Sequence, residues 1–297
     1  MEITTLGYAN KGFFMKVLIW DLPTRLFHWL FAGSILSSFL IAEFAEKETP
    51  LFYLHVVFAI LASLLLIWRL VWGFVGSQHS RWSEFLFSPK ELINYFTSLL
   101  TGKGKYYSGH NPAGSYTTLA IMGIAAFTVL SGILITKSEL FEELHESLPI
   151  VIMVLVGVHI AGVLLASVMH KESYLLSMIN GTKTGDSNSA IKKHHYFPAL
   201  LMIGFVGFGW GYFIKGFDRN SAIFTAPGTQ WTYQVGEAEE NEGGAEDNEN
   251  GNEDDDNESL NNSSNNTLDQ KNKTYDIQNI PNAEDESGEL DKDGDDD

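Results

Sequence analysis

Residues 148–169, LPIVIMVLVGVHIAGVLLASVM, form an apolar run in which His159 is the one ionisable side chain. About 20 apolar residues let a helix cross the hydrocarbon core of a bilayer, so this run predicts a membrane-spanning helix. His145 stands fourteen residues before His159. Fourteen helical residues turn by about 1400°, roughly 40° short of four turns, and rise about 21 Å. The two imidazoles therefore share one helix face at two depths.

Four further stretches are long and apolar enough to cross a membrane. They are residues 26–42, 51–74, 116–135 and 196–214. The first is short, and we expect the apolar residues 17–20 to extend it across the interruption at residues 21–24. We predict an all-α membrane protein, in which four transmembrane helices form a bundle and a fifth lies beside it.

The composition of the whole chain hides this membrane character. The mean hydropathy is −0.02 and the net charge is −18, values that suggest an ordinary acidic soluble protein. Residues 237–297, however, carry 23 acidic residues and three lysines, a net charge of −20, which leaves +2 for the remaining chain. The acidity therefore belongs to the tail alone.

These features divide the chain into four parts. We predict an N-terminal extension at residues 1–15, a bundle at 16–185, a linker and fifth helix at 186–217, and an acidic disordered tail at 218–297. Residues 12–20 run into Asp21 and Pro23 without a small-residue cleavage site, so we expect no cleaved signal peptide. Met15 is an alternative start, which would make the extension an artefact.

Basic residues are distributed unevenly between the two sides of the predicted spans. Lysine and arginine gather before the first span, after the second and after the fourth, whereas the other loops are rich in glutamate. Cytoplasmic loops carry the excess of basic residues. We therefore expect a cytoplasmic N-terminus and, after five spans, an acidic tail on the outer side of the membrane.

The chain has nine histidines and no cysteine, which excludes thiolate ligands and covalent haem attachment. Histidine is therefore the expected ligand of any bound redox cofactor. The predicted orientation places His28 and His159 in the inner half of the membrane and His55 and His145 in the outer half. Ionisable groups within membranes usually face the bundle interior and are functional candidates.

Two histidine pairs at matched depths, on different helices, are what two haem b groups with two axial imidazoles each require. We therefore predict that His28 and His159 ligate one iron, and His55 and His145 the other. For any single histidine at a span end, an interfacial position is the alternative. His170 is the strongest competitor, because it lies eleven residues from His159 on nearly the same helix face.

Cofactor contacts beyond the ligands are less specific. Arg25, Arg69 and Arg81 lie near the predicted cytoplasmic surface, where a guanidinium can pair with a haem propionate or hold a quinone oxygen. The distribution of basic residues alone explains each of the three positions equally well. Small residues near the histidines leave room for a flat macrocycle or for ordinary helix packing. They are Gly33, Ala59, Gly132, Gly157, Ala161 and Gly162.

Several motifs resemble those of one family. They are VLIWDLPTRLFHW at residues 17–29, WRLVWGFVG at 68–76, GHNPAG at 109–114, and LHE at 144–146 followed by His159. Together they cover residues 16–185 and resemble the bacterial cytochrome b561 family, which is related to the b-type cytochrome subunits of nickel-iron hydrogenases. The resemblance implies a four-helix bundle with two haem b groups, ligated at His28, His55, His145 and His159. The fifth span and the tail depart from the family's pattern.

The leading hypothesis is a dihaem b-type cytochrome that transfers electrons between membrane quinone or quinol and a redox partner. That partner is expected to be a periplasmic c-type cytochrome or a membrane oxidoreductase subunit. One alternative is a haem-bearing anchor for a hydrogenase or dehydrogenase; another is a histidine-lined transporter, although no span contains a buried acid to complete an ion path. Membrane lipid is an expected partner, nucleic acid is not, and a homodimer is left open.

The acidic tail has few aromatic residues and cannot bury enough apolar surface to offset the entropy of ordering. It is expected to act as a solvating extension or as an electrostatic attractor for a basic periplasmic protein. Residues 291–295, DKDGD, resemble the start of a calcium loop but lack its later bidentate glutamate.

Overall fold

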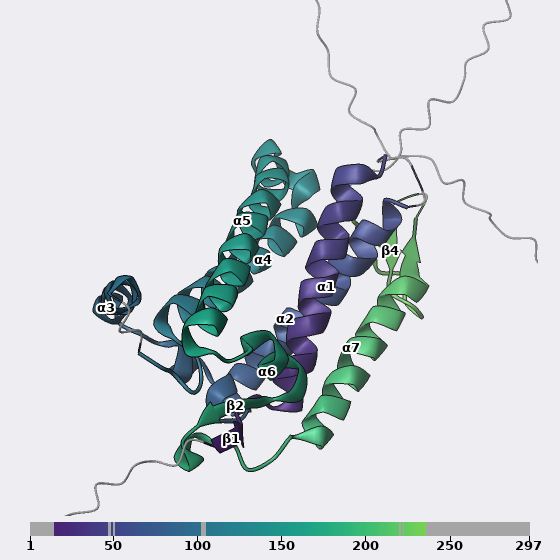
Figure 1. Ribbon diagram of the computed structural model, residues 1–297. Helices are drawn as coiled ribbons and strands as arrows, with labels where there is room; N and C mark the ends of the chain where they lie inside the picture. Colours follow the sequence, from purple (N-terminus) through teal and green to yellow (C-terminus); the bar gives the residue numbers. More distant parts are fainter. Residues whose placement is uncertain are drawn as a thin grey trace, which may run out of the picture. The chain divides into compact units, whose positions relative to one another are not determined.

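The computed structural model describes residues 15–46, 49, 51–101, 105–219, 221 and 223–235 (Figure 1). Five of its helices are long and apolar enough to cross a membrane. The prediction of an all-α membrane protein is confirmed, and the chain is a multi-pass membrane protein. The five helices are α1 Leu22–Phe44, α2 Tyr53–Val75, α4 Pro112–Ile133, α5 Glu139–His170 and α7 Tyr196–Gly216.

The first four spans form two helical hairpins, because α1 packs along α2 and α4 packs along α5. The hairpins meet chiefly through α2 and α4. A shared core of buried apolar side chains joins them, and it includes Phe31, Leu65, Met122 and Ile152, one from each helix. Most other apolar side chains of α5 remain exposed, as expected for a surface that faces lipid or a cofactor.

The start of α1 differs from the prediction. Residues 17–20 do not extend the first span, because residues Met15–Leu18 form the strand β1. Asp21 then caps α1 by accepting a hydrogen bond from the Thr24 backbone at 2.8 Å, and Pro23 occupies the first turn. The interruption at residues 21–24 is therefore the beginning of the helix.

One end of the bundle, called here the β1–β2 end, is closed by a two-stranded sheet. β1 pairs antiparallel with β2, Thr182–Gly185, so that Met15 lies opposite Gly185. The segment between α5 and β2 contains the short helix α6, Tyr174–Asn180. Residues before the first span are thus joined to residues after the fourth.

The connection between α2 and α4 contains the remaining helices of this end. Two 3-10 turns, η1 Gln78–Ser80 and η2 Trp82–Phe85, lead to the amphipathic helix α3, Pro89–Leu100. Ser88 and Glu91 form a reciprocal capping box, which fixes the residue at which α3 begins. Two further 3-10 turns are η3, Ile135–Lys137, and η4, Ser187–Ser189.

Helix α7 lies against the first hairpin, mainly along α2. The Trp210 indole donates a hydrogen bond to the Val57 carbonyl at 3.0 Å. At Gly209 the two helices approach so closely that a Cβ atom would lie 3.0 Å from the Leu64 side chain. Small residues at such positions let membrane helices pack by close van der Waals contact.

A three-stranded antiparallel sheet follows α7 at the opposite end of the bundle, called here the far end. Its strands are β3 Phe217–Asp218, β4 Ile223–Thr225 and β5 Thr232–Gln234. The sheet falls in the first part of segment 218–297, for which the sequence predicted no structure. This part contains aromatic residues such as Phe224 and Trp231, whose rings pack edge-on with centroids 6.2 Å apart. The acidic tail and its calcium-loop resemblance lie outside the described residues.

We expect Gly209→Leu to destabilise the protein by about 1–3 kcal/mol, because the new side chain must displace Leu64 at a packed helix interface. Thermal unfolding in detergent measures the effect. Gly207→Leu is the matched control, since a Cβ there meets nothing within 4 Å. Equal midpoints for the two variants would show that α7 does not pack on α2 in this way.

Candidate cofactor site

Four of the nine histidines meet as two pairs across the two hairpins. The rings of His28 on α1 and His159 on α5 have centroids 6.5 Å apart. Those of His55 on α2 and His145 on α5 have centroids 6.0 Å apart. The structure therefore brings together the same two pairs that share a predicted depth in the sequence.

Both separations suit two imidazoles that ligate one metal from opposite sides. A metal–imidazole bond is about 2 Å long and the ring centroid lies about 1 Å behind its nitrogen, so the two centroids are expected roughly 6 Å apart. Among the described residues, no three His, Asp or Glu side chains converge as they would around a bare metal ion. Two histidines alone fit a metal that a macrocycle already holds, as in a haem with two axial histidines.

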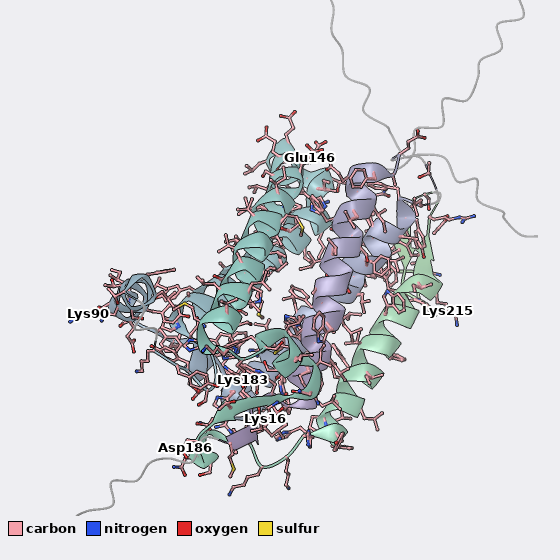
Figure 2. The ribbon with its side chains drawn as sticks, in the orientation of Figure 1. Lys16, Lys90, Glu146, Lys183, Asp186 and Lys215 are labelled. Carbon is pink, nitrogen blue, oxygen red and sulfur yellow. The ribbon has the colours of Figure 1, made fainter. Side chains whose placement is uncertain are left out.

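The two pairs lie towards opposite ends of the bundle. α5 begins six residues before His145 and ends eleven residues after His159. Figure 2 shows Glu146 at the far end and Lys183 at the β1–β2 end. Because fourteen helical residues rise about 21 Å, the pairs form two separate sites rather than one.

The His55–His145 pair has fixed ring orientations. His55 Nδ1 lies 2.9 Å from the Ser38 carbonyl oxygen, and His145 Nδ1 lies 3.0 Å from the Thr128 carbonyl oxygen. A carbonyl oxygen can only accept, so each Nδ1 carries the proton and donates it. Each Nε2 is then the unprotonated nitrogen, which is the form that ligates a metal.

Gly132 allows His145 to lie close to α4. A Cβ atom at residue 132 would come within 2.6 Å of Cε1 of the His145 ring. Neither atom could keep its place, because real Cβ atoms do not approach other atoms this closely. Of the small residues singled out in the sequence, Gly132 thus has a contact with a predicted ligand, whereas a Cβ at Gly33, Gly157 or Gly162 would meet nothing within 4 Å.

The His28–His159 pair has a different environment. His28 Nδ1 is buried without a hydrogen-bond partner among the described residues, and its ring packs edge-on against Trp29 at 4.9 Å. A buried polar atom without a partner is costly. This nitrogen is therefore an atom that a bound group or an ordered water would satisfy.

Two arginines near this pair retain unused donors. Arg69 is only 2 % exposed, its guanidinium lies 4.4 Å from the centre of the Trp82 ring, and Nη1 has no partner among the described residues. Arg25 stands one helical turn before His28 and donates from Nη1 to the Ile179 carbonyl. Its buried Nε has no partner within the described part of the chain. Buried guanidinium groups with free donors are suited to an anionic partner.

His110 is a buried residue that the sequence did not mark as functional. It lies just before α4, where its ring packs against Phe85 at 4.0 Å and Trp20 at 4.8 Å. Burial, followed by the nearby charge of Arg69, holds the pKa of His110 well below its usual range. Its motif, GHNPAG, is one of those that carry the family resemblance, but nothing else in the sequence indicated that its side chain is buried.

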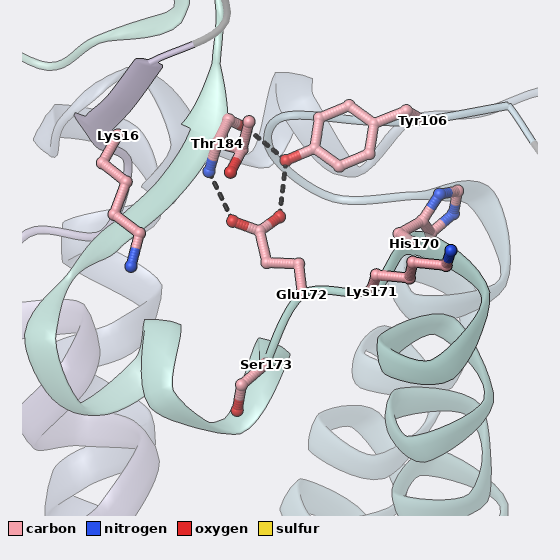
Figure 3. Close-up of a pocket in the computed structure, with 7 residues that line it drawn as sticks. All are labelled: Lys16, Tyr106, His170, Lys171, Glu172, Ser173 and Thr184. Carbon is pink, nitrogen blue, oxygen red and sulfur yellow. Dashed lines mark hydrogen bonds between the residues drawn. The ribbon is translucent and has the colours of Figure 1, made fainter.

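His170, the competing ligand candidate, is not paired with another histidine in the described part of the chain. Its ring contacts Tyr106 at 5.4 Å and Tyr174 at 6.2 Å, at the end of α5. It lines a pocket at the β1–β2 end instead of facing His28 (Figure 3).

The chain is similar to a known family and to several known proteins. Residues 19–181 match the family model described as prokaryotic cytochrome b561. A protein of Rhizobium leguminosarum bv. viciae is 26 % identical over 217 residues, which are 57 % of this chain and 89 % of that protein. One of Rhodobacter capsulatus is 23 % identical over 219 residues, 57 % of this chain and 82 % of that protein. Both are named probable Ni/Fe-hydrogenase B-type cytochrome subunit.

No solved structure is significantly similar to the chain. The family match nevertheless contains all four paired histidines and extends from the end of β1 to the segment before β2. It also covers more than half of the chain, and the resemblance inferred from the motifs is confirmed. The chain belongs to the prokaryotic cytochrome b561 family, whose members are membrane b-type cytochromes of electron transfer.

Proposed function

We propose that this membrane b-type cytochrome holds two haem b groups and moves electrons between the quinone or quinol pool and a redox partner. The observation that carries the proposal is the pair of centroid separations, 6.5 Å for His28–His159 and 6.0 Å for His55–His145. In this assignment each histidine pair provides the two axial ligands of one haem. The two sites form successive steps of an electron path across the bilayer.

Bound haem supplies one-electron redox chemistry. The protein supplies the ligands and controls their orientation. At the far end, the Ser38 and Thr128 carbonyls hold His55 and His145 with Nε2 free. At the β1–β2 end, Arg25 and Arg69 would balance the negative charge of haem propionates. The charge of Arg69 would also favour the reduced state of the nearby haem.

The proposed orientation follows from the basic residues. The β1–β2 end contains lysines from the segments before the first span and after the fourth, such as Lys16 and Lys183 (Figure 2). Cytoplasmic loops are enriched in such residues. We therefore assign the β1–β2 end to the cytoplasm, the far end to the periplasm, and the protein to the bacterial inner membrane. The acidic tail is then assigned to the periplasmic side, where its negative charge favours a basic partner such as a c-type cytochrome.

A haem-bearing anchor of a larger complex is the second candidate. It is favoured by the names of the relatives, which describe cytochrome subunits of Ni/Fe-hydrogenases. The chain would then receive electrons from, or pass them to, a hydrogenase or another oxidoreductase bound to it. Purification from native membranes distinguishes the two, because an anchor remains attached to a partner subunit, whereas a free carrier does not.

Replacing single ligands tests the assignment of two haems. We expect two haem b groups per chain in the unmodified protein and one in His159→Ala or His145→Ala, measured as pyridine haemochrome per purified chain. His170→Ala is the control and retains both groups, because His170 lies beside tyrosines at the end of α5. Two outcomes would refute the pairing. One is a single haem in the unmodified protein; the other is that His170→Ala loses a haem while His159→Ala keeps both.

Crowding one ligand tests the role of its neighbour. Gly132→Val should abolish haem binding at the His55–His145 site alone, because the new side chain occupies the place of the His145 ring. Gly123→Val is the matched control on the same helix, since it lies nine residues earlier, on the opposite face, with nothing within 4 Å of a Cβ atom. Full haem content in both variants would contradict the proposed position of His145.

Removing a buried charge tests the role of Arg69. Arg69→Gln should lower the midpoint potential of the haem at the His28–His159 site, because a nearby cation stabilises the reduced form. Spectroelectrochemical titration of both haems measures the change, and the other haem serves as an internal reference. Arg81→Gln is the control, because that side chain instead donates to the Gly76 carbonyl at 2.9 Å. Unchanged potentials in Arg69→Gln would place the guanidinium away from the haem.

A further inference from the structure

A polar pocket of about 340 Å³ opens at the β1–β2 end, away from the histidine pairs (Figure 3). It lies between the two strands and the turn that joins α5 to α6. Its lining residues are Lys16, Tyr106, His170, Lys171, Glu172, Ser173 and Thr184. The membrane-spanning helix α5 ends at His170, so the pocket lies where the chain leaves the hydrocarbon layer.

The acidic residue of the pocket, Glu172, already accepts hydrogen bonds from neighbouring residues. Glu172 accepts a hydrogen bond from the Tyr106 hydroxyl at 2.9 Å and another from the Thr184 backbone at 2.5 Å. The nearby Lys183 is fully buried and donates to the Tyr107 carbonyl at 2.9 Å. Burial lowers the pKa of Lys183 to about 8, while the Glu172 charge opposes this shift. Burial raises the pKa of Glu172, but these hydrogen bonds and the Lys183 charge outweigh it and hold the pKa below its usual range. Glu172 therefore keeps its negative charge, which the Lys183 charge partly offsets.

Two lysines that line the pocket have no acidic partner among the described residues. Lys16 and Lys171 are exposed, and neither forms an ion pair with a residue that the structure describes. Lys171 also adopts the left-handed conformation, with φ 52°, directly after the last residue of α5. Glycine is the usual residue at this position. The pocket thus presents two free cations, one from β1 and one from the end of a membrane helix.

The surface next to the pocket is apolar. Val168, less than one turn before His170, is 77 % exposed. Further exposed aliphatic side chains lie on the last turns of α5 and on α6, and they are Leu164, Leu165, Leu175, Leu176 and Ile179. At the end of a membrane span such side chains face acyl chains. The pocket therefore combines a cationic rim with an adjoining apolar surface.

We propose that this pocket binds the headgroup of an anionic phospholipid. Lys16 and Lys171 lie on opposite sides of the pocket (Figure 3) and attract the phosphodiester by their charge, as basic pockets of membrane proteins attract anionic headgroups. Ser173 Oγ accepts from the Leu176 backbone at 3.2 Å, which leaves its hydroxyl proton free to donate to a phosphate oxygen. The acyl chains lie along the exposed aliphatic side chains of α5 and α6. A zwitterionic headgroup would bind more weakly, because the lysines would repel its own ammonium group.

The test uses the delipidated, haem-loaded, full-length chain and native mass spectrometry. The probes are phosphatidylglycerol, phosphatidylcholine and inorganic phosphate. We expect phosphatidylglycerol to bind more tightly than the other two, and Lys16→Gln with Lys171→Gln to weaken it by at least tenfold, since each lysine contributes about fivefold. Replacing both lysines by arginine retains binding. Lys90→Gln on α3 is the matched control and leaves binding unchanged.

Three outcomes would overturn the proposal. They are equal binding of phosphatidylcholine, unchanged phosphatidylglycerol binding in the double glutamine variant, and inorganic phosphate binding as tightly as the lipid. The last would indicate an anion pocket rather than a lipid site. The haem spectrum is recorded for every variant. Because neither lysine contacts the histidine pairs, an intact spectrum shows that the variant is folded and separates this result from the haem assignment.

Discussion

Lipid offers no hydrogen bonds, so every buried polar atom of a membrane bundle must find its partner within the protein or on a bound group. The His55–His145 pair satisfies this constraint in a specific way. His55 on α2 donates to a carbonyl of α1, and His145 on α5 donates to a carbonyl of α4. Each ring is therefore oriented by the other helix of its own hairpin. Docking of the two hairpins then needs only to set the distance between two rings whose directions are already determined.

The other pair does not follow this rule. His28 has a buried Nδ1 without a partner among the described residues, and unpaired guanidinium donors lie nearby on α1 and α2. This end of the bundle is consequently less complete without a bound group than the far end is. The two histidine pairs therefore have unequal electrostatic surroundings, which under the proposed assignment would give the two haems different potentials.

Much of this arrangement could be predicted from the sequence, because a membrane imposes strong rules. Apolar length identifies the five spans, and helical rise with alternating direction brings His28 to the depth of His159. Local elements were harder to predict. Residues 17–18 are apolar enough for a span, yet they belong to β1, because their hydrogen bonds go to β2, more than 160 residues away. Periodicity within a short window cannot reveal such a partner.

The same limitation applies to side chains whose importance depends on burial. His110 lies in a polar segment next to a proline, and only the tertiary structure shows its ring enclosed by Phe85 and Trp20. The sheet β3–β5 was also missed, since the acidity of the later tail dominated the composition of the whole C-terminal segment.

The pairing of β1 with β2 has a consequence for how the protein is made. β1 leaves the ribosome before the first span, but its partner strand appears only after α5 has been synthesised. During most of membrane insertion β1 is an unpaired edge. The pairing of β1 with β2 is therefore the last contact to form in the four-helix unit. Contacts between such distant parts of a chain form slowly. Until β2 is synthesised, this end of the bundle lacks the contact that joins the segment before α1 to the segment after α5.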